Sequence, residues 1–388
     1  GRIVAIDHKP KDMHIMLGHA YFSDAFSKKF SKLLREQYDS DKVRKELWEG
    51  FLESNLKELE ICERRYADGI INEFDSLDEL RAFDDRYVND SGSVIFKNIS
   101  KTLGIEEKDI SGIKIIKNGL TNLSFVFSVR DRKERYVYRH PGVGTEKYIS
   151  RKSEAFSESI AKKLGLDSTI IYIEPDEGWK ISLFIEDAHV LDYSNDDEVD
   201  CAIAMLKKLH DQKLKSDFDF DIRAKTEEFE SMIIGAKTSF EDYSAISKGM
   251  KMLYELTRRD AVEPVLCHCD SYSPNFLVDP NGNMSLIDWE YSGNDDPASD
   301  LGTFIACSDW TVERAGKCIE SYLGENVSAG EIAHFTAYVA IASYYWFVWA
   351  LYQESIGNLM GEWLYLWYVN TKTYMKKGFE LYGEKGDM

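Results

Sequence analysis

The stretch LCHCDSYSPNFLVDPNGNMSLIDWEYSG, from Leu266 to Gly293, places polar residues around two short apolar runs. The runs Phe276–Val278 and Met284 to Ile287 flank a segment, Asp279 to Asn283, that contains proline, asparagine and glycine. A segment of this kind between two apolar runs predicts a β-hairpin. The sequence therefore predicts two short strands joined by a tight turn in this stretch.

The predicted hairpin brings three oxygen-bearing side chains together. Asp270 and Asn275 precede the first strand and Asp288 ends the second, so the turn returns Asp288 toward the other two. Two carboxylates and one amide are ligands that suit a hard cation such as Mg²⁺. The alternative is that Asp270 and Asn275 only stabilise a turn through local hydrogen bonds.

The composition limits the kinds of partner. The 388 residues are enough for two or three domains, and the 44% that are hydrophobic can form sizeable cores. A formal net charge of −20 argues against nucleic acid or an anionic membrane as a partner, and it suits a cationic small substrate. A phosphate site would still need lysine or arginine side chains gathered locally.

Cysteine usage and hydropathy favour a cytoplasmic protein without membrane insertion. The six cysteines are scattered, and only Cys267 and Cys269 are close, on either side of His268. Alternate residues of an extended segment point to opposite faces, so this group is a poor metal site and reduced, buried thiols are expected. The uncharged run from Phe335 to Leu351 is short for a membrane span, so a buried helix is expected there.

Apolar spacing divides the chain into three regions, 1–90, 91–187 and 188–388. The first combines a strand over 3–6 with amphipathic helices over 22–38 and 41–58. The second carries a helix over 150–164 and strands over 112–117, 122–130, 136–139, 168–173 and 179–184. The third is helical apart from the hairpin, with helices over 197–212, 222–239, 244–259, 311–323, 329–352 and 360–382. The fold class is therefore α+β, with a mostly antiparallel sheet and one helix against it.

Five motifs in this order resemble the choline/ethanolamine kinases, particularly the bacterial choline kinases, of the protein-kinase-like and aminoglycoside phosphotransferase superfamily. The motifs are NGLTNLSFVFSV, YVYRHPGVGTEKYISRKSE, LCHCDSYSPNFL, LIDWEYSGNDDPASDLG and YYWFVWALYQ. The resemblance covers residues 91–388. It implies a two-lobe fold, with a five-stranded antiparallel N-lobe that binds ATP and a mostly helical C-lobe that carries the catalytic loop and the choline pocket.

The resemblance also implies roles for the residues around the hairpin. Asp270 would orient or deprotonate the substrate hydroxyl, and Asn275 and Asp288 would hold Mg²⁺ on the ATP phosphates. Phosphoryl transfer depends mainly on positioning and charge neutralisation, which such a group can supply. His268 is expected to be structural, and Asp300 is expected to brace the catalytic loop.

The nucleotide site is expected in the N-lobe. Gly119, Thr121 and Asn122 lie in a turn between strands, where backbone N–H groups can face phosphates. Arg139 occupies the place of the strand lysine of protein kinases, as in choline kinases, and its fork suits phosphate oxygens.

Two further parts of the nucleotide site follow from the resemblance. Glu154 is the expected partner of Arg139, with Glu158 one turn later as the rival; the alternative is that Arg139 and Glu154 are surface residues. The segment formed by Phe184, Ile185 and Glu186 links the lobes and is expected to dock adenine through its backbone.

The acceptor site is expected beyond the hairpin. By resemblance, Tyr291, Trp346 and Trp349 wall a pocket for a quaternary ammonium, and the two tryptophans share one helix face. Cation–π contacts contribute about 0.5 to 2 kcal/mol each. Glu290 is expected to supply the countercharge, with Asp309 as a second candidate. The alternative is that both tryptophans belong to the core.

The first ninety residues lie outside the kinase resemblance. The segments IMLGHAYFSDAFSKKF and INEFDSLDELRAF resemble the last part of phosphocholine cytidylyltransferase-like nucleotidyltransferases, a partial α/β segment in which Asp75 fits a Mg²⁺ position. The nucleotide loop of that family would lie before Gly1. One hypothesis is a bifunctional protein that makes phosphocholine and then CDP-choline, and the alternative is a helical cap that stabilises or dimerises the kinase.

The sequence therefore predicts Mg²⁺-dependent transfer of a phosphoryl group from ATP to the hydroxyl of choline. A kinase for ethanolamine or an aminoglycoside is the nearest rival, and a catalytically silent nucleotide-binding scaffold is the rival from another class. The tryptophan pair favours choline, because primary amines prefer carboxylates. The intact set Asp270, Asn275 and Asp288 argues against a silent scaffold. A monomer and a homodimer both remain open.

Overall fold

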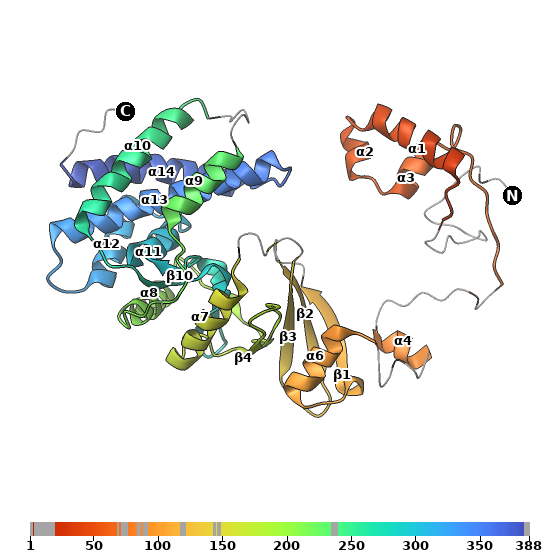
Figure 1. Ribbon diagram of the computed structural model, residues 1–388, viewed down its shortest axis with the longest axis horizontal. Helices are drawn as coiled ribbons and strands as arrows, with labels where there is room; N and C mark the ends of the chain where they lie inside the picture. Colours follow the sequence, from red (N-terminus) through yellow and green to blue (C-terminus); the bar gives the residue numbers. More distant parts are fainter. Residues whose placement is uncertain are drawn as a thin grey trace. The chain divides into compact units, whose positions relative to one another are not determined.

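The computed structural model describes residues 3, 20–67, 70, 77–83, 87, 92–116, 122–142, 145, 149–233 and 240–383. These residues belong to two compact units, Gly1–Phe83 and Asp84–Met388, each with its own packed core (Figure 1). Some predictions concern residues outside the described ranges, namely most of the strand over 3–6, Asp75, Gly119 and Thr121.

The first unit contains short helices around a small apolar core. Its described helices are α1 (Asp24–Gln37), α2 (Asp41–Lys45), α3 (Trp48–Ser54) and α4 (Leu77–Phe83). The core is formed by Leu33, Phe51, Leu52 and Leu59. The single helix predicted over 41–58 is interrupted, because the backbone at Glu46 is extended (φ −90°, ψ 140°) and the chain turns before α3.

The second unit begins with a five-stranded antiparallel sheet in the order β1-β2-β3-β5-β4. The strands are β1 (Ile110–Ile116), β2 (Asn122–Val129), β3 (Arg135–Pro141), β4 (Ile170–Ile173) and β5 (Lys180–Leu183). This sheet confirms the prediction of a five-stranded antiparallel lobe. The name "sheet lobe" is used below for residues 92–187 and "helical lobe" for residues 188–383.

Cross-strand aromatic pairs stabilise one face of the sheet. The rings of Phe127 and Tyr136 stack with centroids 5.5 Å apart, and Phe125 and Tyr138 stack at the same distance. Such pairs are a main source of stability in antiparallel sheets. Helix α6 (Val94–Leu103), followed by the 3-10 turn η1 (Glu107–Asp109), packs its apolar side against this face.

Helix α7 (Arg151–Leu164) connects β3 to β4 and has an unusual buried face. Ser150 caps its first turn by accepting a hydrogen bond from the N–H of Ser153 (3.3 Å), and Gly165 ends it in the left-handed conformation (φ 66°) that glycine adopts freely. The face that α7 buries is largely polar and includes Arg151, Ser153, Glu154, Ser157 and Glu158. Buried charges require partners, which the active site supplies.

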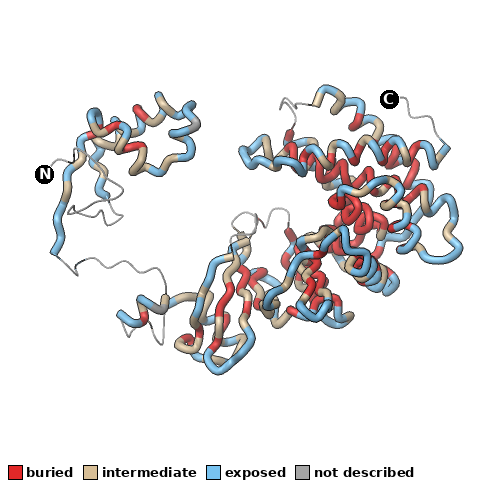
Figure 2. Tube along the Cα trace, turned by 180° about the vertical axis from the view of Figure 1, so that it is seen from behind, coloured by how far each residue is buried: buried red, intermediate tan, exposed pale blue. Residues whose placement is uncertain are grey.

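The helical lobe surrounds one long central helix. Its helices are α8 (Asp196–His210), α9 (Ile222–Met232), α10 (Tyr243–Thr257), α11 (Pro297–Ala306), α12 (Val312–Leu323), α13 (Ala329–Ser355) and α14 (Glu362–Leu381). The buried helix predicted over Phe335 to Leu351 is the middle of α13, and the buried residues gather inside this lobe (Figure 2). Of the helices in the described ranges, none has the length and apolar character needed to span a membrane.

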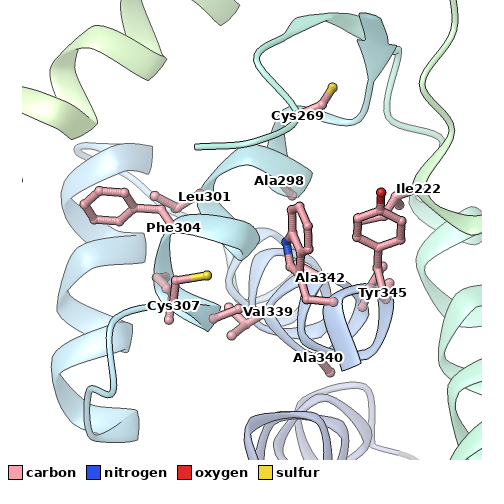
Figure 3. Packing of buried hydrophobic residues seen from close by; sticks show 14 of the residues in the cluster. Ile222, Cys269, Ala298, Leu301, Phe304, Cys307, Val339, Ala340, Ala342 and Tyr345 are labelled. Atoms are coloured by element: carbon pink, nitrogen blue, oxygen red, sulfur yellow. The ribbon is translucent and has the colours of Figure 1, made fainter. Parts of the chain in front are cut away.

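Helices α11 and α13 approach each other closely at Gly302. A β-carbon at this position would lie 2.5 Å from the carbonyl oxygen of Tyr338 in α13, so the two backbones can meet only at glycine. Figure 3 shows buried residues of both helices in the core, among them Leu301 and Phe304 of α11 and Val339 of α13. This contact fixes the helix that supports the catalytic loop.

Two small sheets complete the helical lobe. The predicted hairpin is confirmed as β8 (Phe276–Val278) and β9 (Met284–Leu286), with β6 (His189–Val190) on the other side of β8. The second sheet pairs β7 (Val265–Cys267) with β10 (Gly293–Asp295), and neither this pair nor α11 was predicted. Short 3-10 turns lie between these elements, namely η3 (Arg258–Asp260), η4 (Ser273–Asn275) and η5 (Trp289–Tyr291).

Candidate active site

The loop between β7 and β8 gathers the three oxygen-bearing side chains. The Asn275 side-chain amide donates to Asp270 Oδ2 (2.9 Å) and to the Asp270 carbonyl oxygen (2.8 Å). The Ile287 N–H donates to the Asn275 carbonyl oxygen (2.8 Å), which brings the end of β9, and with it Asp288, to the same loop. Asp270, Asn275 and Asp288 thus form one cluster.

Asp300 of α11 holds the backbone of this loop. Its two carboxylate oxygens accept from the N–H groups of His268 (2.7 Å) and Cys269 (2.6 Å), and Ser271 donates to its carbonyl oxygen (2.6 Å). These bonds maintain Cys269 at a φ of 65°, a conformation that non-glycine residues rarely adopt without surrounding restraint. The loop between β7 and β8 is therefore tied to α11, the helix packed on α13.

Two histidines have structural surroundings. His210 Nε2 lies 2.9 Å from Asp300 Oδ2, and its Nδ1 lies 2.7 Å from the Tyr322 hydroxyl, so its partners are side chains and not the backbone of its helix end. Burial would raise the pKa of Asp300, but the bonds from His210 and the loop outweigh it and lower the pKa. Burial lowers the pKa of His268, whose Nε2 lies 2.9 Å from the Ile287 carbonyl oxygen.

Negative charge accumulates around Asp270. Burial, followed by the charge of Asp288, raises the pKa of the Asp270 carboxyl well above its usual range, although the bond from Asn275 opposes this shift. A bound cation stabilises such a group. The Asp288 side chain is 37% exposed and open to an ion, so the residues present fit Mg²⁺, with Asn275 and Asp288 as oxygen ligands.

Arg139 of β3 lies in a buried ion-pair network. It forms a close ion pair with Glu154, and its Nη1 lies 3.6 Å from Asp288 Oδ1. Its Nη2 donates to the Gly178 carbonyl oxygen (2.9 Å). Arg139 and Glu154 are both almost fully buried, which excludes the alternative that they are surface residues.

Lys180 and Arg151 belong to the same network and were not predicted. Lys180 Nζ lies 2.6 Å from Glu158 Oε1, so Glu158 pairs with this lysine and Glu154 with Arg139. Burial would raise the pKa of Glu154, but Arg139 and Lys180 outweigh it and lower the pKa to about 2. The sequence signal was the polar face of α7, in which charged residues recur three and four positions apart.

Glu290 has different neighbours from those expected. Its Oε2 accepts from the Asn122 side-chain amide (2.8 Å) and lies 3.5 Å from Arg151 Nη1 and 3.8 Å from Arg139 Nη1. These partners all come from the sheet lobe. The role of Glu290 as a countercharge for choline stays a prediction.

The segment that links the lobes is held to the start of β3. The Phe184 N–H donates to the Arg135 carbonyl oxygen (2.9 Å), so this N–H is already used by the sheet. The Arg135 guanidinium lies over the Phe184 ring (4.5 Å) and pairs with Glu186 (2.5 Å) on the surface. Ile185 is half-buried between them. The segment expected to bind adenine is therefore one whose backbone is held by the sheet.

Four tryptophans of α13 and α14 form an indole cluster, defined as Trp346, Trp349, Trp363 and Trp367. Trp346 stacks on Trp367 (centroids 5.8 Å apart) and meets Trp349 edge-on (5.6 Å), and Trp363 stacks on Trp367 (5.4 Å). Trp346 is buried and Trp349 half-buried. Trp363 and Trp367 were not predicted, although their spacing of four residues places them on one helix face.

Two residues connect the indole cluster with Asp270 of the loop between β7 and β8. Burial and then the charge of Asp270 raise the pKa of Tyr345, whose ring is 4.9 Å from that of Trp346. Burial raises the pKa of Cys307 to about 12. The neighbouring Trp367 side chain lowers this pKa, and the charge of Asp270 raises it. Tyr345 and Cys307 are therefore close enough to feel the charge of Asp270, and both also neighbour residues of the indole cluster.

The two remaining acceptor candidates are less closely connected to the indoles. Tyr291 is half-buried at the end of η5 and packs against the main core. Asp309 lies in an exposed turn after α11 with a φ of 52°. Among the described residues, no hydrogen bond or ion pair joins Asp309 to the indole cluster.

An antiparallel sheet lobe with a buried Arg–Glu pair, joined to a helical lobe with a braced H-x-D-x₄-N loop, defines a phosphotransferase of the protein-kinase-like fold. The chain belongs to the phosphotransferase enzyme family, since a model of that family matches residues 113–331, more than half of the chain.

Known relatives agree with this family. The Protein LicA of Haemophilus influenzae is 23% identical over 256 residues, which are 63% of this chain and 74% of that protein. The solved structure of the choline kinase LicA from Streptococcus pneumoniae is similar with a TM-score of 0.61 and 24% identity, over 74% of this chain and 99% of that chain. At this identity the structural likeness establishes the fold.

A separate likeness involves a cytidylyltransferase. The 2-aminoethylphosphonate cytidylyltransferase of Lancefieldella rimae is 30% identical over 88 residues, which are 23% of this chain and 36% of that protein. The match covers about a third of that relative. It gives weak support to the nucleotidyltransferase-like character of the first unit.

Proposed function

We propose that this chain transfers the γ-phosphoryl group of ATP to the hydroxyl of choline. The observation that supports this proposal is the indole cluster, whose neighbours Tyr345 and Cys307 feel the charge of Asp270. A quaternary ammonium binds to aromatic faces by cation–π attraction. Choline that is held by its ammonium against these indoles would have its hydroxyl directed toward Asp270.

Asp270 would act on the acceptor hydroxyl. The hydroxyl oxygen forms a bond to the γ-phosphorus as the bond from that phosphorus to the β–γ bridging oxygen breaks, and the hydroxyl proton passes to Asp270. A carboxylate whose pKa is raised by burial and by neighbouring carboxylates accepts a proton more readily. Mg²⁺ on Asn275 and Asp288, when bound, would neutralise phosphate charge.

The sheet lobe would hold the nucleotide. Arg139 extends from β3 toward Asp288 and is oriented by Glu154, so its guanidinium is positioned for phosphate oxygens. Lys180 adds a second buried cation within the same network. Asn122, at the start of β2, belongs to the turn in which backbone N–H groups are expected to face the phosphates.

Choline is favoured over a primary amino alcohol by the surroundings of the acidic residues. An ethanolamine ammonium would need a carboxylate as a hydrogen-bond acceptor. Glu290 is engaged with Asn122, Arg139 and Arg151, and Asp309 is in an exposed turn. The half-buried Trp349 and the exposed Trp363 would present indole faces to the three methyl groups.

The test is an acceptor panel with the purified chain, Mg²⁺ and ATP. ADP release is measured by a coupled assay with choline, ethanolamine, an aminoglycoside and 3,3-dimethyl-1-butanol, an uncharged analogue of choline, and the product is identified by ³¹P NMR. Choline-dependent ADP release together with a phosphocholine signal is expected, with little turnover of the uncharged analogue. ADP release that is indifferent to every acceptor would overturn the proposal.

We also propose that residues 1–90 are the last part of a cytidylyltransferase-like domain in a bifunctional protein. The likeness to the cytidylyltransferase of Lancefieldella rimae supports this. The test is to extend the chain upstream of Gly1 and to assay CDP-choline formation from CTP and phosphocholine. A cytoplasmic location is part of the proposal, because all six cysteines lie in the described ranges and are free.

A further inference from the structure

Glu290 connects the metal-binding loop to three elements of the sheet lobe. It lies in η5, two residues after Asp288, and one of its oxygens faces Asn122 at the start of β2 (2.8 Å), Arg151 at the start of α7 (3.5 Å) and Arg139 in β3 (3.8 Å). A single carboxylate thus joins the start of β2, the start of α7 and the strand β3 to the helical lobe.

A second contact fastens α7 to the same segment. The Ser153 hydroxyl donates to the carbonyl oxygen of Ser292 (2.7 Å), two residues after Glu290. Arg151 also donates to Thr145 Oγ1 (2.7 Å) and Glu154 Oε2 (2.9 Å). Since Glu154 is the partner of Arg139, the position of Arg151 affects the orientation of the phosphate-binding guanidinium.

The surroundings leave Arg151 little freedom. A β-carbon at Gly178 would lie 2.3 Å from Arg151 Cδ, so the backbone of the β4–β5 turn closes over the arginine stem. The carbonyl oxygen of the same glycine accepts from Arg139 Nη2 (2.9 Å). Both arginines are therefore enclosed by one turn on one side and faced by Glu290 on the other.

Apart from Asp288, the charges of the network balance when Glu290 is included. Three cations, Arg139, Arg151 and Lys180, face three carboxylates, Glu154, Glu158 and Glu290. If Glu290 were neutral, Arg139 would carry an excess of positive charge next to Asp288, whose Oδ1 is 3.6 Å away. If Arg139 paired more strongly with Asp288, the arginine would be less available to bind phosphate and the aspartate less available to bind the metal.

We propose that Glu290 is a positioning residue of the nucleotide side, which keeps Arg139 available for phosphate and Asp288 available for the cation. This inference rests on the phosphotransferase reaction proposed above. Glu290 acts through Arg151 and Asn122 and does not touch the acceptor. The competing role, a countercharge for a cationic acceptor, makes the opposite kinetic prediction.

The test is the Glu290→Gln variant, which keeps an oxygen for the Asn122 amide and removes the charge. The KM for Mg²⁺-ATP and the Mg²⁺ concentration for half-maximal rate are expected to rise about tenfold or more, a typical effect of losing a charge-assisted contact. The KM for choline is expected to stay within about twofold, because no contact to the acceptor is lost. A rise in the choline KM with an unchanged ATP KM would overturn the proposal, and so would no change in either.

Two further variants make the result specific. Glu263→Gln removes an exposed carboxylate that pairs only with Lys215 (3.1 Å) in the described contacts, and it is expected to change neither KM. The double variant Arg151→Gln/Glu290→Gln is expected to have an ATP KM no higher than the worse single variant, since both changes remove one interaction. Full additivity would show that Glu290 does not act through Arg151.

The outcome is independent of the identity of the acceptor. The Kd for Mg²⁺-ADP, measured by calorimetry on the wild-type chain and on Glu290→Gln, tests the inference even if choline is not phosphorylated. If Glu290→Gln does not fold, Glu290→Asp keeps the charge at a shorter reach. Weaker Mg²⁺-ADP binding by this variant supports the inference, and unchanged binding overturns it.

Discussion

The replacement Gly302→Ala probes the contact that supports the catalytic loop. The new β-carbon would lie 2.5 Å from the Tyr338 carbonyl oxygen and 2.8 Å from its carbonyl carbon, both backbone atoms that cannot rotate away. Non-bonded contacts to a β-carbon essentially never fall below 3.0 Å, so α11 and α13 must separate by at least about 0.5 Å. Overpacking of this kind costs about 1–3 kcal/mol.

The gain in helix propensity acts in the opposite direction. Alanine in place of a helical glycine stabilises by about 1 kcal/mol, so Gly302→Ala is expected to lower the unfolding free energy by about 0–2 kcal/mol in total. Gly316 of α12 is the matched control, because a β-carbon there meets nothing within 4 Å and only the gain remains. The two variants should therefore differ by about 1–3 kcal/mol.

The assay is chemical denaturation followed by tryptophan fluorescence. Seven of the eight tryptophans lie in the second unit, so the signal reports the unit that contains the contact. The turnover number of Gly302→Ala should also fall, because α11 carries Asp300, whose carboxylate holds the N–H groups of His268 and Cys269. Equal unfolding free energies for Gly302→Ala and Gly316→Ala would refute the steric reasoning.

Three other changes have defined outcomes. Asp270→Asn should abolish turnover while leaving the Kd for Mg²⁺-ADP within a few-fold, as measured by calorimetry, and near-normal turnover would remove Asp270 from its role. Trp349→Ala should raise the KM for choline by about 2- to 30-fold, which is the equivalent of losing one cation–π contact. The KM for ATP should change little. Equal effects on both KM values would count against the acceptor site. Burial raises the pKa of Asp295 to about 8. The folded state therefore binds more protons than the unfolded state between about pH 4 and pH 8. The unfolding free energy should fall as pH rises through this window. Asp295→Asn should flatten that dependence and stabilise the chain at pH 8 by about 1–3 kcal/mol in denaturation curves, and a loss of stability at pH 8 would contradict it.

Much of the fold followed from local patterns in the sequence. The hairpin β8–β9 was predicted because a proline- and glycine-containing turn separates two apolar runs, and α13 because its apolar run is long enough for a buried helix. Helix α11 was missed because its residues are buried on every side, so it has no polar face and no helical period. The pair β7–β10 was missed because each strand has only three residues, too few for an alternating pattern.

The sequence by itself determined which residues could take part in phosphoryl transfer, since motif spacing assigns Asp270, Asn275 and Asp288 to one hairpin. Only the tertiary structure decided how the charges are paired. Glu290 follows Asp288 by two residues and is predicted from sequence to face the acceptor. In the structure its carboxylate pairs with Arg139 and Arg151, which lie more than a hundred residues earlier. Ion pairs depend on distance in space, and local sequence carries no information on which distant strand or helix will supply the opposite charge.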